Sequence, residues 1–73
     1  MPKLPRISGS ECISVLKRLG FAQLRQKGSH VIMRRGPKGC VVPLHRELKV
    51  GTLAGVLKQA GIDAAEFEKA WHD

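Results

Sequence analysis

One histidine in the middle of the chain stands among cationic side chains and follows a Gly-Ser pair. This histidine is His30, and its neighbours of interest are Arg25, Lys27, Gly28, Ser29 and Arg34. Cleavage of RNA needs a base that takes the proton from a ribose 2′-hydroxyl, and cations that stabilise the charge developing on the phosphate. Histidine, whose unperturbed pKa is about 6.5, suits the first task, and Lys and Arg suit the second. These residue types suit RNA phosphodiester chemistry, with no cofactor and no metal site visible in the sequence.

The two residues before the histidine have separate expected roles. Gly28 would let the backbone approach a phosphate closely, and its N–H group could donate a hydrogen bond. Ser29 fits a turn residue better than a nucleophile, because no acidic partner for a catalytic triad is in sight. A histidine beside a turn is, on its own, more often a surface residue than a catalyst, and Arg25 and Arg34 could simply form the solvated side of a sheet. The pattern alone leaves both interpretations open.

A second histidine is a candidate auxiliary residue. His45 follows Val42-Pro43-Leu44, where an extended segment ends, and it could supply a proton to the leaving oxygen. Alternatively it hydrogen-bonds the connecting segment and fixes the start of the next helix, which we favour because polar loop side chains often serve the backbone. His72 lies in a segment expected to fray, and it receives no role.

Two extended runs must position His30 and its cationic neighbours. Phe21–Lys27 and His30–Arg35 are separated by two residues, glycine first, which is typical of a hairpin with a type II′ turn. The expected pairs are Lys27 with His30, Gln26 with Val31, Arg25 with Ile32, Leu24 with Met33 and Gln23 with Arg34. Because side chains alternate between faces, one face should be apolar and carry Leu24, Val31 and Met33. The opposite, cationic face should carry Gln23, Arg25, Lys27, His30 and Arg34, with Ile32 among them.

Helices are expected before and after this hairpin in the chain. Ser8 and Glu11 have the spacing of a capping box, which begins a helix near Gly9 that Gly20 ends. The apolar residues of this helix recur at helical spacing and are Cys12, Val15, Leu16 and Leu19. A second helix ends at Gly61, and its apolar residues are Val50, Leu53, Ala54, Leu57 and Ala60. A short third helix begins after Asp63, with Glu66 in its first turn.

A third strand is expected between the hairpin and the second helix. Gly36–Gly39 should form a turn, and Cys40–Val42 a strand ending at Pro43, which cannot donate a ladder hydrogen bond and so indicates a sheet edge. The order is then α-β-β-β-α with a short extra C-terminal helix, an α+β fold. A three-stranded antiparallel sheet would carry both helices on one face, as in the double-stranded RNA-binding domain, and leave its other face open. We expect a single domain over residues 1–73.

The composition indicates a polyanionic partner. Thirteen Lys and Arg against six Asp and Glu give a net charge of +7 and a pI near 10.1. This excess favours nucleic acid over a basic surface kept only for solubility. No apolar run could span a bilayer and residues 1–6 lack the apolar region of a secretory signal, so we expect a cytoplasmic protein with no membrane partner. Cys12 and Cys40 lack Cys-x-x-Cys spacing and are expected as buried thiols, not as a disulfide or zinc site.

The aromatic residues fit a core better than an RNA-binding platform. Phe21, Phe67 and Trp71 are the only aromatics, and their spacing is that of core and helix packing. A sheet that stacks several bases needs aromatic side chains interleaved along its strands. RNA would then be held through its backbone, through its shape, or by an exposed apolar residue such as Ile32.

Four blocks of residues stand together in an order and spacing that chance would rarely produce. They are Ser8-Gly9 with Glu11 opening a helix that ends Leu19-Gly20-Phe21, then Arg25-Gln26-Lys27-Gly28-Ser29-His30, then Val42-Pro43-Leu44-His45 with Gly51-Thr52-Leu53, and finally Leu57-Lys58-Gln59-Ala60-Gly61-Ile62. Together they resemble the HicA-type toxins, also called the YcfA-like family. The resemblance covers nearly the whole chain.

This resemblance implies a toxin of a toxin–antitoxin pair that acts as a ribosome-independent mRNA interferase, with a fold like that of the double-stranded RNA-binding domain. It implies a cognate HicB-type antitoxin that holds the toxin inactive by covering it. The essential histidine of the family falls on His30 and the glycine of its motif on Gly28, the turn already singled out by its chemistry. Direct DNA binding is not expected without the antitoxin.

Three functions therefore stand side by side. In the catalytic interpretation, His30 is the general base on the 2′-hydroxyl, the product is a 2′,3′-cyclic phosphate, and Lys27 and Arg25 bind the phosphate. A non-catalytic RNA-binding module would use the same basic face without cleavage. A basic interaction protein would instead bind an acidic protein without RNA, a property that a toxin neutralised by an antitoxin would share.

Overall fold

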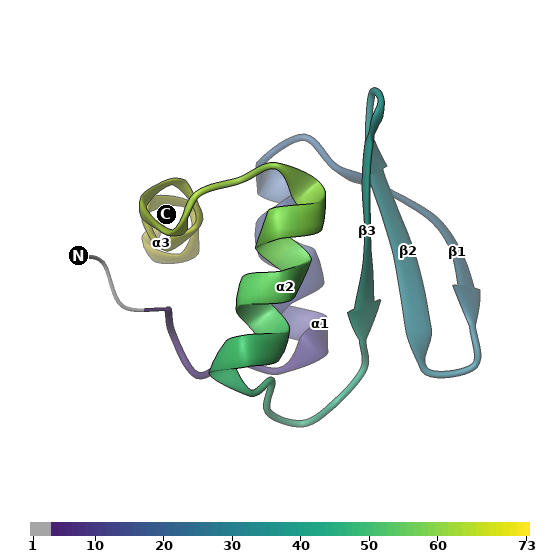
Figure 1. Ribbon diagram of the computed structural model, residues 1–73, viewed down its shortest axis with the longest axis horizontal. Helices are drawn as coiled ribbons and strands as arrows, with labels where there is room; N and C mark the ends of the chain where they lie inside the picture. The colour runs from purple at the N-terminus through teal and green to yellow at the C-terminus, as the bar shows by residue number, and fades with distance from the viewer. Residues whose placement is uncertain (1–3) are drawn as a thin grey trace.

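A computed structural model describes residues 4–73. Met1–Lys3, which form half of the segment 1–6 where no secretory signal is expected, lie outside the described residues. The elements in chain order are α1 (Gly9–Arg18), β1 (Ala22–Lys27), β2 (His30–Arg35), β3 (Lys38–Pro43), α2 (Val50–Ala60) and α3 (Ala64–His72). The strands form one antiparallel sheet in the order β1-β2-β3. Figure 1 shows α1 and α2 on one side of this sheet, with α3 beyond them. The expected α+β fold and the placement of both helices on one face are confirmed.

Local capping signals set the ends of the helices. The Ser8 hydroxyl accepts a hydrogen bond from the Glu11 N–H at 3.0 Å, and the Glu11 carboxylate accepts one from the Ser8 N–H at 2.9 Å, which confirms the capping box. Gly20 has a φ of +95°, so the chain reverses and the Phe21 N–H donates to the Leu16 carbonyl at 2.9 Å. The predicted end of α2 at Gly61 and the cap of α3 at Asp63 are also confirmed.

The core fills the space between the helices and the inner face of the sheet. The side chains that are most completely buried there include Cys12, Val15, Leu16, Val31, Met33, Val42 and Leu53, and Phe67 of α3 extends the core beyond α1 and α2. Both cysteines are buried free thiols, as expected. Phe21 and Phe67 are buried and Trp71 packs against the core, so the assignment of the aromatics to packing is confirmed.

The apolar stripe of α2 differs from the prediction. Val50 is 59% exposed and Ala54 is also exposed, whereas Val56 is buried with Leu53 and Leu57. Both stripes have the i, i+3, i+4 spacing of a helix and share Leu53 and Leu57, so periodicity could not choose between them. Packing against the sheet and α3 rotates the buried face toward Val56.

The hairpin has the predicted turn but a different register beyond its middle. Lys27 pairs with His30 and Arg25 with Ile32 as expected, but the register shifts between Gln23 and Arg25, so Gln23 faces Met33 and Ala22 faces Arg34. The predicted pairs of Leu24 with Met33 and of Gln23 with Arg34 are therefore wrong. Leu24 is the extra residue of a β-bulge, which breaks the alternation of faces and leaves its side chain 55% exposed, not in the core.

The two outer strands of the sheet differ in how far other elements cover them. All six residues of β1 are exposed. On β3, the side-chain oxygen of Gln59 from α2 accepts a hydrogen bond from the Val41 N–H at 3.2 Å.

β3 begins at Lys38, not at Cys40, because the φ of +57° at Gly36 completes the turn in only two residues with Pro37. Pro43 ends it at the sheet edge as predicted. No helix within residues 4–73 has the length and apolarity to cross a bilayer.

Candidate functional site

The β1–β2 turn carries His30 at the first position of β2. Gly28 has a φ of +60° and Ser29 a negative φ, the pair of signs that a type II′ turn requires. The side-chain amide of Gln26 donates to the Gly28 carbonyl at 2.9 Å and braces the turn. Gly28, Ser29 and His30 are all exposed. The turn therefore presents an imidazole and accessible backbone groups to solvent at one end of the sheet.

Two cations of β1 share the free face of the sheet with the histidine. Lys27 pairs directly with His30, and Arg25 pairs with Ile32, two residues further along β2. Directly paired residues point to the same face, and the residues that alternate with His30 and Ile32 on β2 are buried in the core. Lys27, Arg25 and His30 thus form one exposed cluster beside the turn.

Arg34 lies on this face but at the far end of β2. Its Nε atom donates to the Gly36 carbonyl at 3.1 Å, which ties the guanidinium to the β2–β3 turn. It lies four positions after His30, which is about 13 Å along a strand. The structure therefore does not bring Arg34 to the Gly28 turn with Lys27 and Arg25.

His45 follows a backbone junction that anchors the turn. The Leu44 N–H donates to the Ser29 carbonyl at 2.7 Å, which joins the segment after β3 to the β1–β2 turn. The His45 carbonyl accepts from the Gly9 N–H at 2.9 Å, and its side chain is exposed. His45 was expected to fix the start of α2, but it fixes the segment after β3 to the start of α1 instead. It does so through its backbone carbonyl and not through its side chain.

The junction depends on close packing at the start of α1. A Cβ atom at Gly9 would collide with the Pro43 carbonyl oxygen and lie 2.9 Å from the Leu44 Cα atom. Glycine alone lets the helix N-terminus approach the end of β3 this closely. The position of the turn and its histidine thus depends on contacts from three parts of the chain.

The cationic face is not neutralised by nearby carboxylates. The chain has no Asp or Glu between Glu11 and Glu47, a range that includes all three strands. Within residues 4–73 the one ion pair joins His72 and Glu68 on α3, at 3.9 Å. Lys27 and Arg25 make no side-chain hydrogen bond or ion pair with any described residue, so their charge is available to a ligand.

Two other arginines serve the fold instead. The Arg35 guanidinium lies 4.8 Å from the centre of the Phe21 ring and donates to the Leu19 carbonyl at 2.8 Å. Arg18 donates to the Ala70 carbonyl at 3.0 Å, near the end of α3. Both neutralise the carbonyl end of a helix.

Sequence reasoning missed three residues near the cluster. Leu24, Val41 and Gln59 line a hollow on the free face together with Ile32 and Arg34. Leu24 reaches it through the bulge, and Gln59 comes from α2 around the edge of β3. Neither the bulge nor a contact between residues 18 positions apart has a signature in the sequence. Ile32 was expected as an exposed apolar residue, and it lies on the free face but is half-buried.

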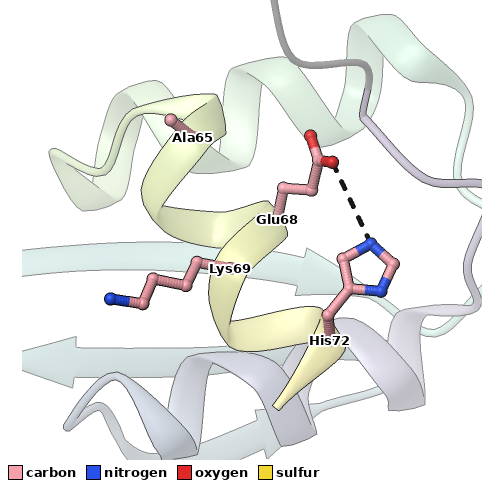
Figure 2. A pocket seen from close by; sticks show the side chains of 4 residues that line it. All are labelled: Ala65, Glu68, Lys69 and His72. Carbon is pink, nitrogen blue, oxygen red and sulfur yellow. Dashed lines mark ion pairs between the residues drawn. The ribbon is translucent and has the colours of Figure 1, made fainter.

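A second hollow lies on α3, away from the sheet. Figure 2 shows its four lining residues, Ala65, Glu68, Lys69 and His72, with Glu68 and His72 turned toward each other and Lys69 away from them. All four come from one face of one helix, so no other element contributes a group to act with them. Among residues 4–73 no three His, Cys, Asp or Glu side chains gather as metal ligands would.

Comparison with known protein families agrees with this geometry. A family model described as the HicA toxin of bacterial toxin–antitoxin systems matches residues 9–62. The matched segment begins with α1, includes all three strands and the turn before His30, and ends just after α2. A search of curated proteins returned no match. Because the family match spans well over half of the 73 residues, the chain belongs to the HicA toxin family of bacterial toxin–antitoxin systems.

Proposed function

We propose that this HicA-family toxin is an endoribonuclease that cleaves mRNA and so inhibits translation and growth. The observation that carries the proposal is the exposed cluster of His30 paired with Lys27, next to Arg25, on a sheet that has no carboxylate. A general base beside uncompensated cations is what attack of a ribose 2′-hydroxyl on its own phosphodiester requires.

The proposed reaction is an internal transfer at one phosphodiester. His30 removes the proton from the 2′-hydroxyl, whose oxygen then attacks the adjacent phosphorus. The bond from phosphorus to the 5′-oxygen of the next nucleotide breaks, giving a 2′,3′-cyclic phosphate and a 5′-hydroxyl. A water molecule or His45 supplies the proton for the leaving oxygen. No metal ion is needed at any step of this route.

The other residues of the turn bind the phosphate. Lys27 and Arg25 stabilise the charge on its non-bridging oxygens, and the backbone at Gly28 and Ser29 approaches it closely because the glycine carries no side chain. Arg34, about 13 Å from His30, contacts the RNA strand further along. General-base catalysis contributes roughly 10²–10⁴-fold, so we expect a slow nuclease.

The test is cleavage of a long single-stranded RNA at low salt in EDTA. We expect the wild type to cleave and His30→Ala to lose at least 100-fold in rate while remaining folded by circular dichroism. His72→Ala, which removes an exposed histidine from α3, is the matched control and should retain full activity. Products ending in a 3′-hydroxyl and a 5′-phosphate would contradict this chemistry, and equal cleavage by the wild type and His30→Ala would exclude His30 as the base.

A non-catalytic RNA-binding module is the second candidate. It is favoured by the presence of a single histidine in the exposed cluster, whose two strand partners, Lys27 and Pro43, include neither a carboxylate nor a second histidine. This function predicts that the wild type and His30→Ala bind RNA equally and that neither cleaves it. A basic protein whose only partner is an acidic protein would bind that partner in the absence of RNA.

Membership of the family implies a cognate antitoxin, and we propose that it covers the free face of the sheet. A HicB-type antitoxin would then need acidic or hydrogen-bonding groups opposite Lys27 and Arg25. In the complex, diethylpyrocarbonate should modify His72 at the rate seen in the free toxin and His30 at least tenfold more slowly, as read by peptide mass spectrometry. A complex in which both histidines react as in the free toxin would place the antitoxin elsewhere.

A further inference from the structure

The free face of the sheet has a shallow apolar hollow next to the cationic cluster. Its volume is about 290 Å³. Leu24, Ile32 and Val41, one from each strand, form its apolar floor, and Arg34 and Gln59 contribute polar groups at its rim. Of the three large apolar side chains that residues 4–73 leave exposed, two lie here: Leu24 is 55% exposed and Val41 is 39% exposed. Exposed apolar side chains gathered at one place indicate a binding surface.

Three local features build the hollow. The bulge turns Leu24 out of the core and onto the free face. Gly39 pairs with Arg34 and has no side chain, which leaves the space between them empty. Gln59 is fixed by the hydrogen bond that its side-chain oxygen accepts from the Val41 N–H at 3.2 Å. Its amide nitrogen makes no hydrogen bond to any described residue and can donate to a ligand.

The hollow lies beside the cluster around His30, on the same face of the sheet. Ile32 lies two residues from His30 on the same face of β2, about 7 Å along the strand. Arg25 pairs with Ile32 and therefore lies between the hollow and Lys27. From His30 the face thus presents cations, then an apolar floor, then the guanidinium of Arg34.

We propose that this hollow binds one unstacked base of a single-stranded RNA whose adjacent phosphate lies at Lys27 and Arg25. The inference rests on the proposed function and adds a subsite to it. An RNA strand alternates anionic phosphates with flat, apolar-faced bases, and the sheet offers cations and an apolar floor in the same alternation. The base lies on Ile32 and Val41, and its polar edge accepts hydrogen bonds from the amide of Gln59 and from Arg34.

An aliphatic floor explains how a sheet without exposed aromatics can hold a base. Burial of the base removes apolar area of Leu24, Ile32 and Val41 from water, which replaces part of the stacking that a Phe or Tyr would provide. The site accepts one base only, because the Arg34 side chain, bonded to the Gly36 carbonyl, limits the hollow at its end away from His30. The RNA therefore has one nucleotide unstacked next to the cleaved phosphate.

The test combines removal of the base with filling of the hollow. Fluorescence anisotropy measures binding of RNA oligonucleotides, each with one abasic nucleotide at a different position, to protein carrying His30→Ala, so that no cleavage occurs. We expect the abasic nucleotide at one position to weaken binding roughly tenfold to hundredfold. Gly39→Ile should fill the hollow and weaken binding of intact RNA to a similar extent. In that variant the same abasic nucleotide should have no further effect.

The matched control is Gly55→Ile, which adds the same side chain to the exposed surface of α2, where a Cβ atom meets nothing within 4 Å. It should bind intact and abasic RNA as the parent does. Additive effects of Gly39→Ile and the abasic nucleotide would overturn the proposal. If Gly39→Ile then also weakened the complex with a co-expressed HicB-type antitoxin, the occupant would be a protein side chain.

Failure of the base subsite and failure of the proposed nuclease activity give different results. Coupling between the abasic position and Gly39→Ile, in a protein whose wild type does not cleave RNA, would keep the base subsite and reject the nuclease. Cleavage that depends on His30 without this coupling would keep the nuclease and reject the subsite.

Discussion

The two cysteine side chains show how burial changes the chemistry of a single group. Burial raises the pKa of Cys12 to about 12, with a smaller contribution from the neighbouring Cys40 thiol. Burial likewise raises the pKa of Cys40 to about 11. A thiol ionises reluctantly where no water can solvate the thiolate, so both groups act as small apolar side chains at neutral pH. Neither is placed to take part in the chemistry of the free face.

These shifts predict a loss of stability at high pH. In the unfolded chain a thiol ionises near pH 9, whereas in the fold both stay protonated until about pH 11 to 12. Above pH 9 the unfolded state therefore binds fewer protons, and the free energy of unfolding falls with pH. The expected slope is up to about 1.4 kcal/mol per pH unit for each thiol.

Urea denaturation between pH 8.5 and 10.5, in reducing buffer, measures this slope. The double variant Cys12→Ala with Cys40→Ala will be less stable at every pH because cavities are created, but its stability should fall less steeply above pH 9. Because the two proteins differ only at these two positions, every other pH-dependent contribution is common to both and cancels in the comparison. Parallel curves for the variant and the wild type would show that the thiols do not cause the loss.

At the scale of the elements, local signals were predictable and contacts between distant segments were not. The capping box at Ser8 and the turn at Gly28 depend on residues within three or four positions, so the sequence alone predicted them. The bulge at Leu24 depends on how β1 meets β2, and the hollow also depends on Gln59 from α2. The buried face of α2 was ambiguous because Val50 and Val56 fit two overlapping helical stripes, and only packing chooses between them. The fold, the turn and its cationic neighbours were therefore predictable, and of the apolar part of the face only Ile32 was.

The close contact between α1 and the end of β3 gives a prediction at this scale. Gly9→Ala places a methyl group against the Pro43 carbonyl, and the backbone must move to relieve the clash. We expect the free energy of unfolding to fall by about 1–3 kcal/mol. Because Leu44 is hydrogen-bonded to the β1–β2 turn, RNA cleavage should fall with it.

The matched substitution is Gly55→Ala in the exposed middle of α2, where a Cβ atom meets nothing. It should raise the free energy of unfolding by about 0.5–1 kcal/mol, since alanine favours the helix. Both values come from urea denaturation monitored by circular dichroism. Equal stabilities for the two variants would mean that α1 does not press on β3 as described.

Over the whole molecule, the charge is separated by element. The sheet carries cations and no carboxylates, whereas four of the six acidic residues lie after residue 62, in and around α3. Since Arg18 and Arg35 are bound to helix carbonyls, the cations free to meet a polyanion include those of β1. The free face thus carries Arg25, Lys27 and Arg34, and no carboxylate stands on its strands.

This asymmetry predicts unequal effects of two chemically identical substitutions. Lys27→Gln should weaken RNA binding about equally for all RNA sequences and lower the slope of log affinity against log salt by about 0.7, the value for one phosphate contact to a single strand. Lys58→Gln, which removes an exposed lysine from α2, should leave the slope unchanged. Anisotropy titrations from 50 to 300 mM salt measure both. Equal slopes for the two variants would show that the net charge acts without regard to position.

The exposed edge strand also bears on how such a toxin can lose its toxicity over generations. The outer side of β1 offers unpaired backbone groups to any other strand, and its protection consists of the bulge and the charges of Arg25 and Lys27. Under the proposed function, mutations that silence the toxin by removing these charges also weaken this protection and leave only the bulge, so the inactive protein aggregates more readily. A replacement of His30 leaves the protection intact. Among spontaneous survivors of toxin expression, soluble inactive proteins should therefore be changed at the histidine more often than at the two cations.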